Sequence, residues 1–162
     1  MSLIPVDDTV VIRAADAEIL GGSPHTLRLL ADGGATAGAL SALRVTLEDG
    51  ADGAVPHHHT GATELLYVLG GTAHLLSGDD VLTAREGDLV IVPPYTPHAI
   101  AAAFGHDADL LVVSTPGTAG LGYFRLLDRL RDGLATIEEL IDSQERFDTH
   151  FLDSPIWRVA RA

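Results

Sequence analysis

Residues 56–71 read PHHHTGATELLYVLGG, which places metal-ligand residue types next to an apolar run that ends in a glycine pair. Side chains at positions i and i+2 of a β-strand point to the same face, so His57 and His59 converge while His58 points away. Thr60 and Gly61 favour a turn that returns Glu64 to the face of the two histidines. The stretch therefore predicts part of a metal centre, and the remaining ligand must come from elsewhere in the chain.

Residues 87–98 read GDLVIVPPYTPH and supply a candidate for that ligand. Pro93 and Pro94 cannot lie in a central strand, because proline has no N–H for the ladder, so they mark the rim of a sheet. The loop that follows delivers His98 at the head of the next strand. Three imidazoles and one carboxylate leave one or two positions of a five- or six-coordinate metal open, which is typical of catalytic sites rather than closed structural ones.

The composition predicts a globular chain and excludes some partners. The chain has 162 residues, of which 46% are hydrophobic and 20% charged, enough to bury a core. A formal net charge of −13 repels phosphate backbones and anionic lipid surfaces, so we expect neither nucleic acid nor membrane as a partner. The chain has no cysteine, so a metal must be held by nitrogen and oxygen ligands. The N-terminal residues show no signal-peptide pattern, which predicts a cytoplasmic protein.

Short β-rich runs with turn residues at each break fill the first two thirds of the chain. The expected strands are residues 9–13, 25–30, 39–47, 64–69, 72–76, 81–84, 89–92, 98–104 and 110–114. This spacing, without an intervening helix, predicts an all-β antiparallel sandwich or barrel and disfavours a parallel sheet.

The periodicity becomes helical after Pro116 and Gly117. Apolar residues repeat at helical spacing in residues 121–130, and Gly133 follows at the position of a C-terminal cap. Thr136 and Glu139 form a capping-box pattern that starts a second helix. We therefore expect a barrel in residues 1–117, with motifs at 56–71 and 87–102, and a two-helix extension in residues 118–162 packed on it.

The two blocks resemble the paired motifs of the cupin superfamily in its single-domain cupin-2 form. The first family motif is Gly, five residues, His-x-His, three or four residues, Glu, six residues, Gly, and it matches at His57, His59, Glu64 and Gly71. The second is Gly, five residues, Pro, one residue, Gly, two residues, His, three residues, Asn, and it matches at Gly87, Pro93 and His98. Ala51, Tyr95 and Ala102 replace family residues, which affects the geometry of the rim but no ligand.

The resemblance implies a jelly-roll barrel, also called a double-stranded β-helix, that binds one divalent transition metal ion: Fe, Mn, Ni, Zn or Cu. His57, His59, Glu64 and His98 are the implied ligands. Glu64 is also the catalytic candidate, because a carboxylate displaced by substrate can accept a proton. Cupins of this size commonly form homodimers, so we expect a homodimer.

A small-molecule substrate is expected inside the barrel. The side chains expected to face inward are apolar, namely Leu43, Val45, Leu47, Leu66, Val68, Ile100 and Ala102, and none is basic. Such a pocket disfavours a strongly anionic substrate. Among cupins with a three-histidine, one-glutamate shell, the flavonol dioxygenases (quercetinases) are also similar in the segment after the barrel, here TPGTAGLGYFRLLDRL at residues 115–130.

The sequence therefore predicts a metal-dependent oxygenase, similar to the quercetinases, that acts on a small apolar enolisable or phenolic compound. One alternative is a redox-silent metal cupin acting as an isomerase or a polyketide-type cyclase. Another is a non-catalytic barrel that binds a metal or a ligand.

The sequence leaves two possible roles open for each of several histidine and aromatic side chains. His74 is either a core histidine or a neighbour of the site, and Tyr95 either contacts substrate or packs at the rim. Phe147, Phe151 and Trp157 cover either the mouth of the barrel or a partner subunit. Three further histidines, His25, His106 and His150, are expected to be exposed.

Overall fold

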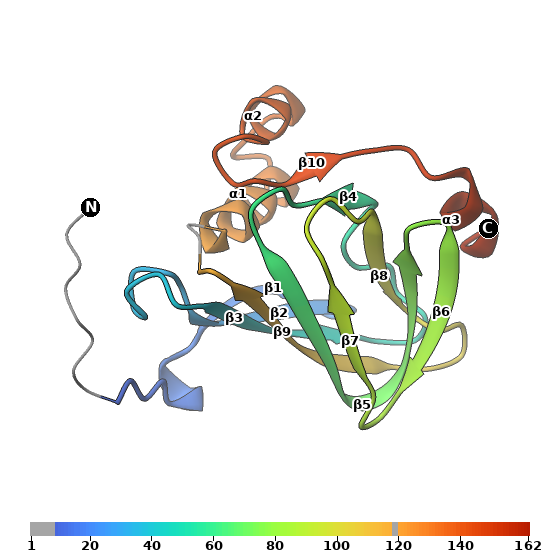
Figure 1. Ribbon diagram of the computed structural model, residues 1–162, viewed down its shortest axis with the longest axis horizontal. Helices are drawn as coiled ribbons and strands as arrows, with labels where there is room; N and C mark the ends of the chain where they lie inside the picture. The colour runs from blue at the N-terminus through green and yellow to red at the C-terminus, as the bar shows by residue number, and fades with distance from the viewer. Residues whose placement is uncertain (1–8, 118–119) are drawn as a thin grey trace.

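Two antiparallel sheets that share one long strand form the body of the protein (Figure 1). The structure is a computed structural model that describes residues 9–117 and 120–162. The first sheet runs β1 (Glu18–Gly22), β2 (His25–Ala31), β3 (Ser41–Leu47), β9 (Ala108–Thr115), the first part of β5 (Thr63–Ser77) and β7 (Leu89–Val92). The second runs β10 (His150–Phe151), β4 (His57–His58), β8 (His98–Ala102), the rest of β5 and β6 (Asp80–Arg85). The all-β barrel predicted from the sequence is confirmed.

Strand alternation builds the core between the sheets. In β3, Leu43, Val45 and Leu47 are buried while Arg44 between them is exposed. All seven side chains expected to face inward are buried, namely Leu43, Val45, Leu47, Leu66, Val68, Ile100 and Ala102. The inner faces of the two sheets are thus mostly apolar, and the buried His57, Glu64 and His98 are exceptions.

Strand β5 passes from one sheet to the other at Gly70 and Gly71. The sequence predicts two separate strands here, but β5 continues through 15 residues. Before the glycine pair it lies between β9 and β7, and after the pair it lies between β6 and β8. Gly71 has a φ of 72°, and a Cβ at this position would overlap the carbonyl oxygen of Asp107. The glycine allows the strand to bend where no side chain fits. The glycine pair, which predicts a break between two strands, therefore lies at a corner of the barrel within one strand.

The N-terminal part departs from the expected order. Residues 9–13 were expected to form a strand but have no regular secondary structure, and a short 3-10 helix (Ala14–Asp16) follows. The first strand is instead β1, at the edge of its sheet, where only Leu20 is buried. An edge strand with one buried residue has no alternating pattern, so apolar periodicity does not detect it.

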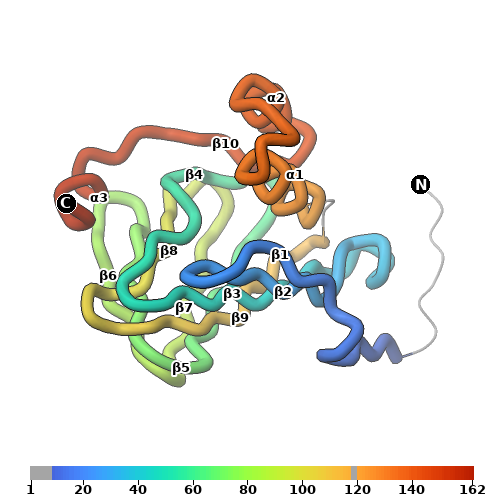
Figure 2. Tube along the Cα trace, turned by 180° about the vertical axis from the view of Figure 1, so that it is seen from behind, coloured from blue at the N-terminus to red at the C-terminus, as the bar shows by residue number. Residues whose placement is uncertain are grey.

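The C-terminal segment runs from α1 and α2 across one end of the barrel and ends at α3, beside β6 (Figure 2). It contains α1 (Leu121–Arg131), α2 (Ile137–Asp142), β10 and α3 (Pro155–Ala160). Thr136 caps α2 as predicted, because its hydroxyl accepts a hydrogen bond of 3.1 Å from the Glu139 amide. The third helix was not predicted, since six residues are too few for a helical period to appear. The predicted boundary between residues 117 and 118 meets residues 118–119, which lie outside the described part.

Helix α3 fastens the end of the chain to the second sheet. Trp157 packs there against Leu76, Ala99 and Ala101. The guanidinium of Arg161 donates to the carbonyl oxygens of Gly50 (2.6 Å) and Ala102 (2.9 Å). The C-terminal end of the segment is therefore held by the barrel. None of the described helices is long and apolar enough to span a membrane.

We expect Gly71→Ala to lower the free energy of unfolding by about 3 kcal/mol or more, because the added methyl group meets backbone that cannot move independently. Gly78→Ala is the matched control, since Gly78 has a similar φ of 61° but no atom within 4 Å of the position that a Cβ would occupy. It should cost only about 1 kcal/mol, the penalty for an alanine in the left-handed region. Urea denaturation of both variants measures the difference, and equal losses would contradict a steric role for Gly71.

Candidate metal centre

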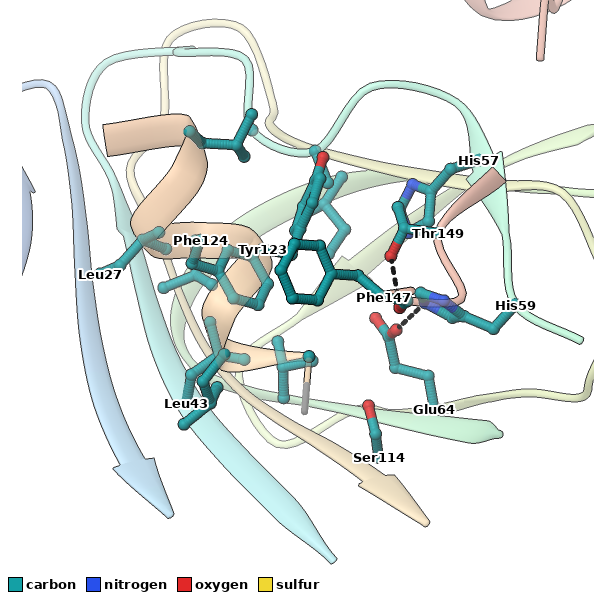
Figure 3. A pocket seen from close by; sticks show the side chains of 18 of the residues that line it. Leu27, Leu43, His57, His59, Glu64, Ser114, Tyr123, Phe124, Phe147 and Thr149 are labelled. Atoms are coloured by element: carbon teal, nitrogen blue, oxygen red, sulfur yellow. Dashed lines mark hydrogen bonds and ion pairs between the residues drawn. The ribbon is translucent and has the colours of Figure 1, made fainter. Parts of the chain in front are cut away.

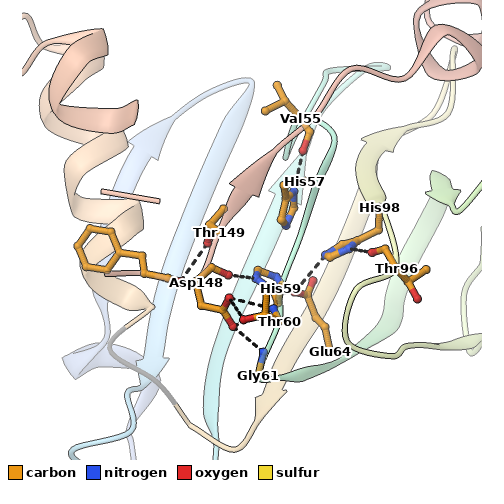
Figure 4. Close-up of polar contacts among 11 residues, drawn as sticks. Val55, His57, His59, Thr60, Gly61, Glu64, Thr96, His98, Asp148 and Thr149 are labelled. Carbon is orange, nitrogen blue, oxygen red and sulfur yellow. Dashed lines mark hydrogen bonds and ion pairs between the residues drawn. The ribbon is translucent and has the colours of Figure 1, made fainter. Parts of the chain in front are cut away.

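Four side chains from three strands and one loop meet at one end of the barrel (Figure 4). His57 belongs to β4, His59 follows that strand, Glu64 is the second residue of β5, and His98 begins β8, directly opposite His57. Each offers one donor atom, and these atoms lie within 4.8 Å of one another. The structure thus brings together all four residues that the sequence predicts as ligands.

Backbone carbonyls orient the three imidazole rings. Nδ1 of His57 donates to the carbonyl of Val55 (2.7 Å), and Nδ1 of His98 donates to that of Thr96 (2.9 Å). Nδ1 of His59 donates to the carbonyl of Asp148 (2.7 Å). A carbonyl only accepts, so Nδ1 must carry the proton and Nε2 is left with a lone pair. All three rings therefore present Nε2 to the centre, as metal-binding histidines do.

The carboxylate of Glu64 lies among these lone pairs. It is only 6% exposed, and its Oε2 lies 2.8 Å from His59 Nε2 and 3.4 Å from His98 Nε2. Two lone pairs at 2.8 Å repel each other unless a proton or a metal ion lies between them. Among the described residues, Nε2 of His98 is buried without a hydrogen-bond partner. The donor set therefore fits a divalent cation, which would be a common partner for all four atoms.

The protonation states also suit a cation. Burial lowers the pKa of His57 to about 3, and the neighbouring His98 acts in the same direction, so His57 is neutral near pH 7. Burial alone would raise the pKa of Glu64, but the hydrogen bonds and positive charge that His59 and His98 supply when they are protonated outweigh it and lower this pKa. A deprotonated carboxylate beside a neutral imidazole is the state in which both bind metals.

A cavity of about 300 Å³ extends from three of these residues, His57, His59 and Glu64, between the first sheet and the C-terminal segment (Figure 3). Its barrel wall is aliphatic, from Leu27, Leu43, Val45, Ile100 and Val112. Its opposite wall, here called the roof, consists of Leu121, Tyr123, Phe124, Phe147 and Phe151. No lysine or arginine lines the cavity among the described residues. Of the two interpretations left open for Phe147 and Phe151, the structure supports covering the mouth of their own barrel.

Close packing of α1 against the following segment makes the roof continuous. A Cβ on Gly122 would lie 2.8 Å from Cε1 of Phe147, so α1 approaches that ring only because residue 122 has no side chain. The ring of Tyr123 has its centroid 5.2 Å from that of Phe124 and 6.2 Å from that of Phe151. These spacings are typical of packed aromatic pairs, so the roof is a connected aromatic layer.

The remaining histidines and Tyr95 lie elsewhere. His58 points away from the centre, as alternation predicts, and its ring stacks on His150 at 5.1 Å. Tyr95 is 70% exposed and does not line the cavity, which does not support a substrate contact. Its φ is 65°, which explains why the family motif has glycine at this position. His74 is half-buried beside Arg161, away from the four ligands.

Sequence reasoning missed several polar residues of the cavity. His25 was expected to be exposed, but it starts β2 and lines the cavity, and burial lowers its pKa, with a smaller contribution from Arg131. Ser41 and Ser114, paired across β3 and β9, also line it, as do Asp148 and Thr149. The sequence offered only one signal for the roof, the concentration of aromatic residues in the tail.

Comparison with known proteins agrees with this architecture. The family model described as "Cupin domain" matches residues 43–114. No curated protein has a sequence that matches the chain. KdgF from Halomonas sp. has a similar structure, with a TM-score of 0.60 and 17% identity over 70% of this chain and 99% of that chain.

Two enzymes from Streptomyces are also similar in structure. The nucleoside dehydratase Pac13 has a TM-score of 0.56 at 15% identity, over 67% of this chain and 83% of that chain. The polyketide cyclase RemF from Streptomyces resistomycificus has a TM-score of 0.54 at 20% identity, over 66% of this chain and 79% of that chain. At these identities the likeness shows the fold alone.

We expect His57→Ala to weaken binding of Zn²⁺ or Co²⁺ by about 100-fold or more, because loss of a ligand should exceed the effect of losing an outer hydrogen-bond partner. His58→Ala, one residue away on the opposite face, is the control and should bind within about twofold of the unaltered protein. Isothermal titration calorimetry measures both affinities. Equal weakening in the two variants, or none in His57→Ala, would show that the ligand set is wrong.

Proposed function

The chain carries a cupin domain, and we propose that this domain is a metal-dependent enzyme for a small, largely apolar aromatic compound. One observation carries the proposal: three imidazole Nε2 atoms and one carboxylate meet at the end of a cavity whose other walls are mostly aliphatic and aromatic. A mostly apolar pocket with a small number of placed polar groups is the usual form of a small-molecule site. In this proposal the histidine and glutamate cluster binds the reacting group of the substrate, and the apolar walls contact the rest of the substrate.

The cavity favours a flat, uncharged substrate with one acidic oxygen. An aromatic ring fits between the aliphatic strand wall and the rings of Tyr123, Phe124 and Phe147, where it gains both apolar burial and ring contacts. The absence of lysine and arginine from the described lining leaves no permanently cationic side chain to pair with a phosphate or a free carboxylate. An enol or phenol oxygen is therefore the group we expect to face His57, His59 and Glu64.

Our first hypothesis for the reaction is a dioxygenase of the quercetinase type. A bound divalent metal supplies Lewis acidity toward the enol oxygen and, when redox-active, activation of dioxygen. Glu64, which is deprotonated and buried, accepts the enolic proton once the substrate displaces it from the metal. Asp148, the other carboxylate that lines the cavity, accepts hydrogen bonds from Thr60 and Gly61 and is not available for this role. Both oxygen atoms enter the product, so no separate reductant is needed.

A second candidate is a cyclase or isomerase, in which the metal acts only as a Lewis acid. The observation that favours it is a set of hydroxyl groups that face the cavity. Burial raises the pKa of the Tyr123 phenol, which therefore stays protonated and can donate. Among the described residues, no hydrogen bond engages this phenol or the hydroxyls of Ser41 and Ser114. Such donors can hold or protonate an enolate during ring closure.

Oxygen consumption separates the two reactions. We expect protein loaded with Fe, Mn, Ni or Cu to consume oxygen with at least one compound from a panel of flavonols and 1,3-dicarbonyls, and protein loaded with Zn to consume none. Isotope-labelled dioxygen should place both labelled atoms in the product. The variant Glu64→Gln, which lacks both the proton acceptor and the anionic ligand, should consume no oxygen with any metal. Turnover of a panel compound without oxygen would contradict the dioxygenase hypothesis and favour the cyclase.

The variant Tyr123→Phe tests whether the phenol takes part in the reaction. For a dioxygenase we expect kcat to stay within about threefold of the unaltered enzyme, because the proton goes to Glu64 and general-acid help is not needed. A decrease in kcat of about 100-fold, with KM little changed, would instead identify Tyr123 as a proton donor and contradict the first hypothesis. Steady-state kinetics on the best panel compound measures both constants.

A further inference from the structure

We propose that Asp148 is a positioning residue for the metal ligand His59, so that the C-terminal segment completes the metal centre of the barrel. The inference rests on the proposed function in one respect, because it takes the four-residue cluster as a metal centre. Asp148 lies outside the residues that match the cupin family, in the connection between α2 and β10.

The contrast among the three histidines carries the argument. His57 and His98 donate to carbonyls two residues earlier in the chain, so local backbone orients both rings. His59 donates to the carbonyl of Asp148, which is 89 residues away in sequence. Only one of the three imidazoles therefore depends on a distant segment, and displacement of that segment would free its Nδ1 and its ring rotation.

Asp148 holds the loop that carries His59 at several further points (Figure 4). Its carboxylate accepts hydrogen bonds from the Thr60 amide (2.9 Å), the Thr60 hydroxyl (2.7 Å) and the Gly61 amide (2.8 Å). His150 Nε2 lies 3.0 Å from the same carboxylate. The turn that connects His59 to Glu64 is thus fixed by the same residue that orients the ring of His59, and two of the four ligands depend on it.

The backbone of Asp148 has the conformation that makes both sets of contacts possible. Its φ is 46°, in the left-handed region that aspartate and asparagine tolerate better than most residues. The turn is closed by a 3.0 Å hydrogen bond from the Thr149 amide to the Gln144 carbonyl. Directly after it, His150 and Phe151 pair with His58 and His57 across β10 and β4. The segment is therefore in register with the ligand strand itself.

The same segment also faces the cavity. Phe147 and Thr149, on either side of Asp148, line it together with the ligands. One short stretch thus contacts the substrate space and supports the metal ligand. A structural role alone, in which Asp148 merely fastens the tail, would require contacts to the barrel but none to a metal-binding ring.

The test compares three single variants of the full-length chain. Asp148→Asn keeps the size and the left-handed backbone but replaces an acceptor oxygen with an amino group that faces N–H donors. Thr60→Val removes one donor from the barrel side of the same contact. Ser154→Ala removes the N-cap of α3 and so loosens the tail at a point that does not touch the metal centre.

We expect Asp148→Asn to weaken Co²⁺ binding, measured by calorimetry, by about 10-fold or more and to change the visible absorption of the bound Co²⁺. Thr60→Val should change both in the same direction by a smaller factor, and Ser154→Ala should leave both unchanged. The double variant Asp148→Asn with Thr60→Val should lose less affinity for Co²⁺ than the product of the two single-variant fold losses, because both variants remove the same contact.

Unchanged affinity and absorption in Asp148→Asn would overturn the positioning role while leaving the metal centre intact. Equal losses in Asp148→Asn and Ser154→Ala would also overturn it, because they would show that any loosening of the tail has this effect. If the unaltered chain bound neither Co²⁺ nor Zn²⁺, the metal centre and the positioning role would both be wrong.

Discussion

The carboxylate of Glu64 is buried among three imidazole rings, and the rest of the site follows from the need to balance its charge. A buried anion is costly unless a cation or several hydrogen-bond donors compensate it. Here two of the three Nδ1 protons point to local carbonyls and the third points to a distant one. The Nε2 atoms therefore face the carboxylate with lone pairs and offer it no hydrogen-bond donor. A divalent cation at the centre would be a common partner for all four donor atoms, and this is the physical basis for proposing a metal site.

The C-terminal segment gives this site its chemical environment. The barrel supplies an aliphatic wall, whereas α1 and the residues before β10 supply the aromatic roof. Gly122 permits the close contact with Phe147, and Arg161 holds the far end of the segment against the barrel. The cluster of three histidines and one glutamate thus opens into a cavity whose described walls carry no lysine or arginine, which is why we favour an enol or phenol as substrate.

Local patterns were sufficient to predict most of the barrel and the four residues that meet at its end. Period-two alternation places His57 and His59 on one face, and the proline pair at the rim delivers His98. The same reasoning failed at Gly71, where a glycine that marks a corner looks like a break, and at β1, whose single buried residue shows no alternation. It also could not find Asp148, because the contact with His59 joins segments 89 residues apart and leaves no periodic trace. His25 was missed for a related reason: the roof over β2 comes from the distant tail.

The most direct test of the central claim is a crystal structure of the full chain grown with Zn²⁺ or Co²⁺, with anomalous scattering recorded at the edge of the metal. We predict one strong anomalous peak within about 2.0–2.2 Å of Nε2 of His57, His59 and His98 and of a carboxylate oxygen of Glu64. The absence of a peak there, or a peak bound by His58 and His150 on the opposite face, would contradict the account.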